Sequence, residues 1–197
     1  MGVDLTGDVR GLTIRQPHAS LICPGPDREP VKRIESARPK TSYRGWVLIH
    51  AGKERPKDGA VVGDWQVHRR VFGSIDSIHP RDRRRRVCHL PLGAVVGVAR
   101  ITDCVPVVKS LGGPDDPLPR VCVSERGLRL MRPFVYPTVD LSDQAPYGVW
   151  TPGTHAYLLD DIVTLPRPVP ARGALGLWRP APDVLAALAQ KDRVADL

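Results

Sequence analysis

Short runs of apolar residues alternate with segments rich in proline and glycine along the whole chain. Runs that are dense in β-branched and aromatic residues are typical of strands. They lie at residues 12–15, 46–51, 93–102, 104–108, 157–165 and 174–178. Three other segments predict helices: residues 18–22, which Pro17 can open, residues 60–75, and a C-terminal helix at about 182–195.

Two stretches between these elements, at about 54–90 and 110–146, are interpreted as insertions. Residues 166–173, PRPVPARG, are expected to form a turn. Short strands, irregular loops and few helices favour an α+β protein that is mainly β, with a small, strongly bent sheet or a partly open barrel. A chain of 197 residues fits a single domain over 1–197.

The basic residues are concentrated in the first half of the chain. Residues 1–100 hold 19 Lys and Arg against 10 Asp and Glu, a balance of +9, whereas residues 101–197 hold 10 against 11, a balance of −1. A basic surface attracts polyanions, chiefly nucleic acid. Arg outnumbers Lys 23 to 6, so the codon usage of a GC-rich genome is an alternative explanation of the excess.

The four cysteines are widely separated and form no CxxC pair. Because zinc and redox sites usually need such pairs, we expect neither a metal nor another cofactor. The first residues have no apolar signal core, and no segment approaches the length of a membrane span. The sequence therefore predicts a cytoplasmic protein without a membrane partner.

Lys32, Glu35 and Arg38 are expected on a short loop between two apolar segments. A lysine beside a carboxylate in a partly desolvated cleft can act as a base or nucleophile, while the carboxylate moves protons. The alternative is a surface salt bridge of small energetic value. Both interpretations stay open from the residue types alone.

Two further groups of polar residues adjoin predicted strands. Arg15 can bind phosphate and Gln16 can read a base edge, unless the two merely support the neighbouring loop. Tyr43, Arg44 and Gly45 offer a ring for stacking, a cation and a backbone that a ligand can approach, unless they form only a β-turn.

His50 ends an apolar strand and is close in sequence to Lys53, so both can line one cleft. A histidine in that position is more often a satisfied core residue than a catalyst. The densest charge run can bind phosphates without sequence preference, or form a solvated loop. It includes Arg83, Arg84, Arg85 and Arg86.

Four stretches resemble the ASCH family, whose members have a PUA-like β-barrel. They are IRQPHASLI, VKRIESARPKTSYRGWVLIHAGK, LGAVVGVARITDCV and AYLLDDIVTLPRPVPARGALGLW. The family pattern is roughly G-x-K-x-x-E-x-R, then Y-R-G and a strand of the L-I-H-A type, and it is matched at Lys32, Glu35, Tyr43, Arg44, Gly45, Ile49 and His50. The leading glycine is replaced by Pro30, and the expected arginine by Ala37, with Arg38 one position later.

The resemblance implies a PUA-like small mixed β-barrel with a few peripheral helices, and a role in RNA binding. One branch of the family removes the acetyl group from N4-acetylcytidine with a lysine, a threonine and a glutamate. Lys32 matches that lysine, whereas Glu35 stands at the position of the threonine, which argues against the same mechanism.

Our leading hypothesis is a barrel that binds RNA or a nucleotide-like ligand in a basic cleft, with RNA or single-stranded nucleic acid as partner. That cleft would be lined by Arg15, Gln16, Lys32, Glu35, Arg38 and Tyr43. The first alternative is an amidohydrolase acting on a modified nucleoside, with Lys32 and Glu35 as catalytic residues. A second is a protein-interaction module that uses residues 110–146 or the C-terminal helix.

Overall fold

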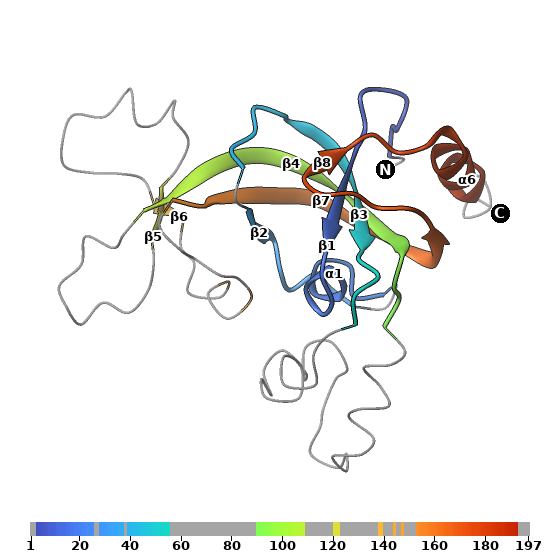
Figure 1. Cartoon of the computed structure of the whole chain (residues 1–197), viewed down its shortest axis with the longest axis horizontal. Helices are drawn as coiled ribbons and strands as arrows, with labels where there is room; N and C mark the ends of the chain where they lie inside the picture. Colours follow the sequence, from blue (N-terminus) through green and yellow to red (C-terminus); the bar gives the residue numbers. More distant parts are fainter. Residues whose placement is uncertain are drawn as a thin grey trace, which may run out of the picture. The chain divides into compact units, whose positions relative to one another are not determined.

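The computed structural model describes residues 3–25, 28–37, 39–55, 90–108, 120–122, 138–139, 144, 147 and 153–192 (Figure 1). Two compact units make up the chain. Unit 1 comprises Met1–Val31, Gly45–Arg100 and Asp161–Leu197, and unit 2 comprises Lys32–Arg44 and Ile101–Asp160. Two long strands, β4 (Ala94–Val108) and β7 (His155–Pro170), contribute residues to both units.

Unit 1 holds a mixed sheet in the strand order β7-β4-β3-β1-β8. Strands β1 (Arg10–Ile14) and β3 (Gly45–Ala51) run parallel, whereas β8 (Leu177–Trp178) pairs with β1 in the antiparallel direction. Between β1 and β3 the chain forms the short helix α1 (His18–Ile22), four of whose residues are buried.

The C-terminal helix α6 (Pro182–Asp192) packs against this sheet. Proline suits its first position, and Asp183 in the first turn interacts favourably with the helix dipole. Val184 and Leu188 lie four residues apart on one face, so both enter the core of unit 1. That core also contains Val9, Leu48, Val95, Val98 and Val169.

Unit 2 is built around the remaining parts of β4 and β7. Strand β2 (Ile34–Ala37) pairs antiparallel with β7, and β5 (Arg120–Cys122) pairs antiparallel with both β4 and β6 (Thr138–Val139). The buried residues that form the core of this unit are Ile34, Val105, Val107 and Ala156.

The sequence predicted β1, β3, β4, β7 and the two described helices, and the fold is mainly β as expected. The strand predicted at 174–178 is wrong in part, because β8 covers only Leu177–Trp178. The loop predicted around Lys32 to Arg38 is wrong in part, because residues 34–37 form β2. The turn predicted at 166–173 is also wrong in part, because β7 continues to Pro170. The PUA-like barrel and the single domain over 1–197 stay predictions.

Strand β7 accommodates three exposed prolines because they occupy alternate positions, 166, 168 and 170. Alternate residues of a strand direct their backbone N–H groups to the same side, so only one side is short of donors. Arg167 and Val169, which alternate with the prolines, retain their backbone N–H groups, and Val169 is buried in the core.

The predicted helix at 60–75 and the arginine run lie outside the described residues, as do most of the two predicted insertions; β5 and β6 fall within 110–146. Among the helices that the structure describes, none is both long and apolar enough to cross a membrane.

Candidate ligand-binding pockets

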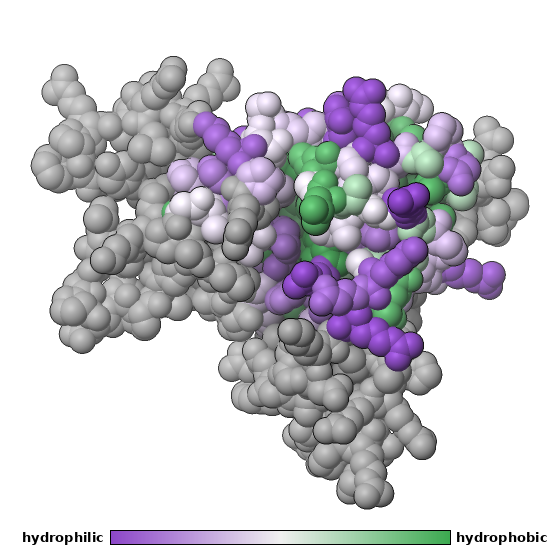
Figure 2. Space-filling view, viewed as in Figure 1, coloured by the Kyte–Doolittle hydropathy of each residue, from purple (hydrophilic) through white to green (hydrophobic). Residues whose placement is uncertain are grey.

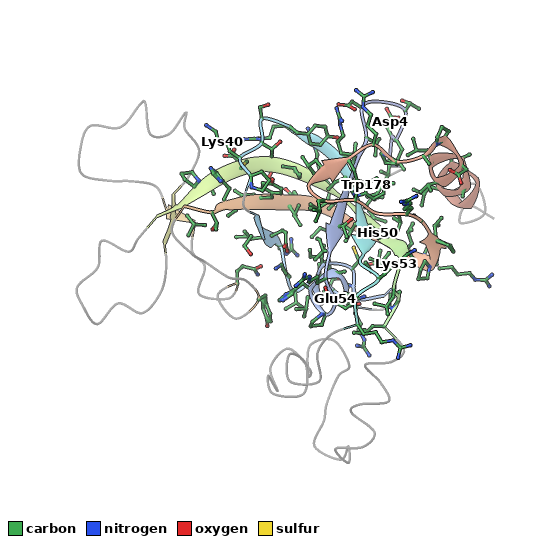
Figure 3. The ribbon with its side chains drawn as sticks, in the orientation of Figure 1. Asp4, Lys40, His50, Lys53, Glu54 and Trp178 are labelled. Carbon is green, nitrogen blue, oxygen red and sulfur yellow. The ribbon has the colours of Figure 1, made fainter. Side chains whose placement is uncertain are left out.

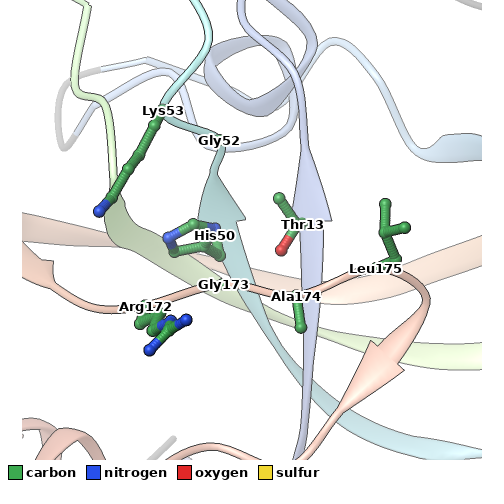
Figure 4. Close-up of a pocket in the computed structure, with 8 residues that line it drawn as sticks. All are labelled: Thr13, His50, Gly52, Lys53, Arg172, Gly173, Ala174 and Leu175. Atoms are coloured by element: carbon green, nitrogen blue, oxygen red, sulfur yellow. The ribbon is translucent and has the colours of Figure 1, made fainter.

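An open pocket of about 360 Å³ lies in unit 1 where the parallel strands β1 and β3 end (Figure 4). Thr13 and His50 are register partners on these strands. The chain that joins β7 to β8 forms the opposite wall. We call this the histidine pocket; it is lined by Thr13, His50, Gly52, Lys53, Arg172, Gly173, Ala174 and Leu175.

His50 is only 2% exposed, and its Nε2 lies 3.1 Å from the carbonyl oxygen of Ala171. A carbonyl can only accept, so Nε2 carries the proton and Nδ1 is left as an acceptor. Nδ1 is buried and has no hydrogen-bond partner among the described residues. Burial lowers the pKa of His50 below its usual 6.5; the bond to Ala171 opposes that shift, and the charge of Lys53 adds to it.

The His50 ring also meets the Trp178 ring edge to face, with centroids 5.8 Å apart (Figure 3). Trp178 Nε1 donates a hydrogen bond of 3.0 Å to Thr13 Oγ1. Gly173 packs closely over both His50 and Thr13, and a Cβ at this position would overlap the imidazole ring and the threonine hydroxyl. Glycine therefore lets the β7–β8 connection approach the sheet closely.

A second pocket of about 460 Å³, the helix pocket, adjoins the first. It is lined by Lys53, Gly93, Pro170, Ala171, Arg172, Ala181, Asp183 and Val184. Lys53 and Arg172 line both pockets and therefore stand at their common wall. The stem of Lys53 passes over Gly93, which adopts a φ of +62°.

Lys53 and Arg172 are both exposed, and neither has an ion pair or hydrogen bond with any part of the chain that the structure describes. Exposed basic side chains of this kind usually find an acidic neighbour or stay in solvent. Here Lys53 and Arg172 border both the histidine pocket and the helix pocket. The arrangement can hold an anionic group of a ligand without first breaking an internal ion pair.

Arg15 and Gln16 also belong to unit 1, in different surroundings. Arg15 is exposed, and its Nε lies 3.1 Å from Glu54 Oε2. Gln16 is buried; its amide donates to the Pro91 carbonyl at 2.9 Å and accepts from the Ser20 N–H at 3.1 Å. Gln16 therefore holds the start of α1 to the loop before β4.

In unit 2, Lys32 and Glu35 form a buried pair rather than a surface salt bridge. Lys32 Nζ lies 2.8 Å from Glu35 Oε2 and donates to the Tyr147 carbonyl at 2.5 Å. The Lys32 side chain is 1% exposed and that of Glu35 16%. Oε2 is buried and accepts no well-aligned hydrogen bond from the described residues, so the short contact with Nζ is chiefly electrostatic.

Tyr157 is a third buried polar side chain of unit 2, and its hydroxyl donates to the Pro39 carbonyl at 2.7 Å. Burial raises the pKa of Tyr157 to about 12, and charges at Cys104 and Glu35 add to the shift. Tyr157 therefore stays a neutral donor at ordinary pH.

Arg44 has its guanidinium engaged within unit 2. It lies 2.6 Å from Asp103 Oδ1 and donates to the carbonyls of Thr41 and Tyr43. The Tyr43 N–H in turn donates to Thr41 Oγ1 at 3.1 Å. These bonds fit the interpretation of this segment as a turn leading into β3.

The predicted site residues thus fall into both units. Unit 1 brings His50 and Lys53 into one pocket, and unit 2 brings Lys32 and Glu35 together. Arg38 and Arg83–Arg86 lie outside the described residues. Among the residues described, no cluster of His, Cys, Asp or Glu could hold a metal ion.

Of the polar residues that line the two pockets, the sequence did not predict three, Thr13, Arg172 and Asp183. The available signal for Arg172 was its place in a Pro- and Gly-rich connection after a strand, where functional side chains often lie. For Asp183 there was one indication only: an acidic residue in the first turn of a helix, which is common at helix starts.

Comparison with protein-family models and with curated proteins found no match to this chain. The resemblance to the ASCH family therefore stays a prediction from the sequence.

Proposed function

We propose that this chain binds RNA or a nucleotide-like ligand through the adjoining pockets of unit 1. The observation that carries the proposal is the pair of cations, Lys53 and Arg172, at the wall between the two pockets. Neither cation is engaged by a carboxylate among the described residues. Phosphate groups are the ligands that arginine and lysine bind most readily in nucleic acids.

The histidine pocket also offers an apolar surface beside these charges. Leu175 is 98% exposed, and Ala174 next to it is exposed as well. Figure 2 shows small green, hydrophobic areas among purple, hydrophilic side chains on the face in view. A nucleotide joins an anionic phosphate to a flat base with an apolar face, so it matches this combination better than a simple anion does.

The sequence supports the same conclusion through its charge and its family resemblance. The balance of +9 over residues 1–100 favours a polyanionic partner. The resemblance to ASCH and PUA-like proteins adds the expectation of an RNA ligand. A PUA-like barrel that binds RNA is therefore our proposal for the protein as a whole.

A filter-binding titration with single-stranded RNA over a salt series tests the proposal. The Lys53→Ala/Arg172→Ala variant should bind more weakly. Its logarithmic salt slope should fall by up to about two, since each phosphate that a side chain no longer neutralises lowers the slope by roughly one. The matched control is Arg28→Ala/Lys40→Ala, which removes two exposed cations outside both pockets.

RNA binding that is undetectable at low salt, or that does not weaken with added salt, would overturn the proposal. An equal decrease in affinity for the pocket variant and for the control would show that these pockets are not the site.

A second candidate function is hydrolysis of a modified nucleoside such as N4-acetylcytidine. The observation that favours it is the buried contact of Lys32 with Glu35, since buried amine–carboxylate pairs recur in active sites. Incubation of the parent protein with N4-acetylcytidine should then release acetate, and Lys32→Arg, which keeps the charge but not the amine, should abolish the release. An absence of product from the parent protein rejects this candidate.

A further inference from the structure

Three charged side chains of mixed sign line the helix pocket without forming an ion pair. Asp183 lines this pocket together with Lys53 and Arg172, and all three are exposed. No ion pair or hydrogen bond joins Asp183 to either cation in the part of the chain that the structure describes. The pocket therefore offers two cations to an anion and a carboxylate to a hydrogen-bond donor.

The three side chains come from different elements of unit 1. Asp183 stands in the first turn of α6, whose Val184 and Leu188 are anchored in the core of unit 1. Lys53 follows β3, with its stem against Gly93, and Arg172 follows the end of β7. Elements held by a sheet and a packed helix keep a site open more reliably than a mobile loop does.

We infer that the helix pocket binds a ribonucleotide unit, with its phosphate on Lys53 and Arg172 and its ribose hydroxyl donating to Asp183. An anionic phosphate is repelled by a carboxylate, so it belongs on the cationic side. A carboxylate accepts hydrogen bonds only, so its fitting partner is a hydroxyl or an N–H group. A volume of about 460 Å³ lies within the range of small-ligand sites.

The inference rests on the proposed function and adds a selectivity to it. The 2′-hydroxyl is the group that distinguishes RNA from DNA at a given site. A carboxylate that accepts from it should make the protein prefer RNA, whereas the phosphate contacts alone would treat both polymers alike.

Fluorescence anisotropy with two labelled decamers, oligouridine and oligodeoxyuridine, measures this selectivity, because the probes differ only at the 2′ position. The parent should bind the ribose form roughly three- to tenfold more tightly, as expected for an exposed hydrogen bond to a charged acceptor. Asp183→Ala should bring the ratio close to one. It should not weaken binding of the deoxy probe, because it removes a negative charge near the phosphate.

Asp4→Ala is the control, since it removes an exposed carboxylate of unit 1 outside the helix pocket and should leave the ratio unchanged. A merely structural role of Asp183 at the start of α6 would lower the thermal midpoint without changing the ratio, and this would overturn the inference. Equal binding of both probes by the parent would also overturn it, while salt-dependent binding would leave the proposed function standing. If neither probe binds, both proposals fail.

Discussion

Lys32 and Glu35 form an ion pair inside unit 2, with Nζ 2.8 Å from Oε2 and the lysine only 1% exposed. Taking two charges out of water is costly, and their attraction offsets that cost only while both partners are present. The Tyr147 carbonyl accepts a further hydrogen bond from the same ammonium. Removing one partner should therefore destabilise the protein more than removing both.

Replacing Lys32 by methionine should destabilise the protein by about 3–5 kcal/mol, because Glu35 is left as an unpaired buried charge. The double variant Lys32→Met/Glu35→Gln should recover part of that stability. Urea denaturation measures both. The exposed pair of Arg15 and Glu54 provides the control, and Arg15→Met should cost no more than about 1 kcal/mol. Equal destabilisation by Lys32→Met and Arg15→Met would contradict a buried pair.

His50 should make the stability of the protein depend on pH. Its pKa is lower in the folded chain than in the unfolded chain, because burial disfavours the charged ring. The unfolded chain therefore binds the proton more readily, so the contribution is fully present above pH 6.5 and is lost as pH falls below it. Urea midpoints between about pH 8 and about pH 5 should show the decline.

The variant His50→Gln should flatten this decline, since an amide can also donate to the Ala171 carbonyl but does not titrate. An equally steep decline in His50→Gln and in the parent would assign the pH dependence to other groups.

Gly173 should tolerate no side chain, although alanine is only one methyl group larger. A Cβ there would overlap the His50 ring and the Thr13 hydroxyl, so the chain between β7 and β8 would have to move outward. We expect Gly173→Ala to cost about 1–3 kcal/mol, as overpacking usually does. Gly7→Ala is the matched control, because its Cβ would meet nothing within 4 Å. Equal midpoints of thermal denaturation for the two variants would show that the β7–β8 connection adapts to the added methyl group without cost.

The strands that the sequence predicted are those whose own residues form an apolar, β-branched run. Residues 46–51 are apolar and β-branched between two glycines, and they form all but the first residue of β3. Residues 34–37 have no such pattern, since a glutamate and a serine interrupt them. They become β2 because β7 offers an antiparallel partner, with Ile34 opposite Leu158. Pairing over such a distance in sequence is not visible in a local pattern.

The same reason limits what the sequence predicted about the site. His50 lies near the end of β3 and Lys53 comes three residues later, so their common pocket could be expected. Arg172 and Asp183 reach the pockets from a distant part of the chain, because β7 is next to β4, β8 pairs with β1, and α6 packs into the core of unit 1. The contact of Lys32 with the Tyr147 carbonyl likewise joins positions that are far apart in the sequence.

The arginine run of residues 83–86 should contribute general affinity for nucleic acid but no selectivity. Exposed guanidinium groups meet phosphates through screened electrostatics, which do not depend on the base. Replacing Arg83, Arg84, Arg85 and Arg86 together by glutamine should weaken binding to all RNAs alike and lower the salt slope by up to about four. Single changes at Lys53 or Arg172, which line the proposed pockets, should instead change the slope by about one or less. Filter binding with several RNAs over a salt series separates the two effects, and a fourfold variant that binds like the parent at every salt concentration would show that the run takes no part.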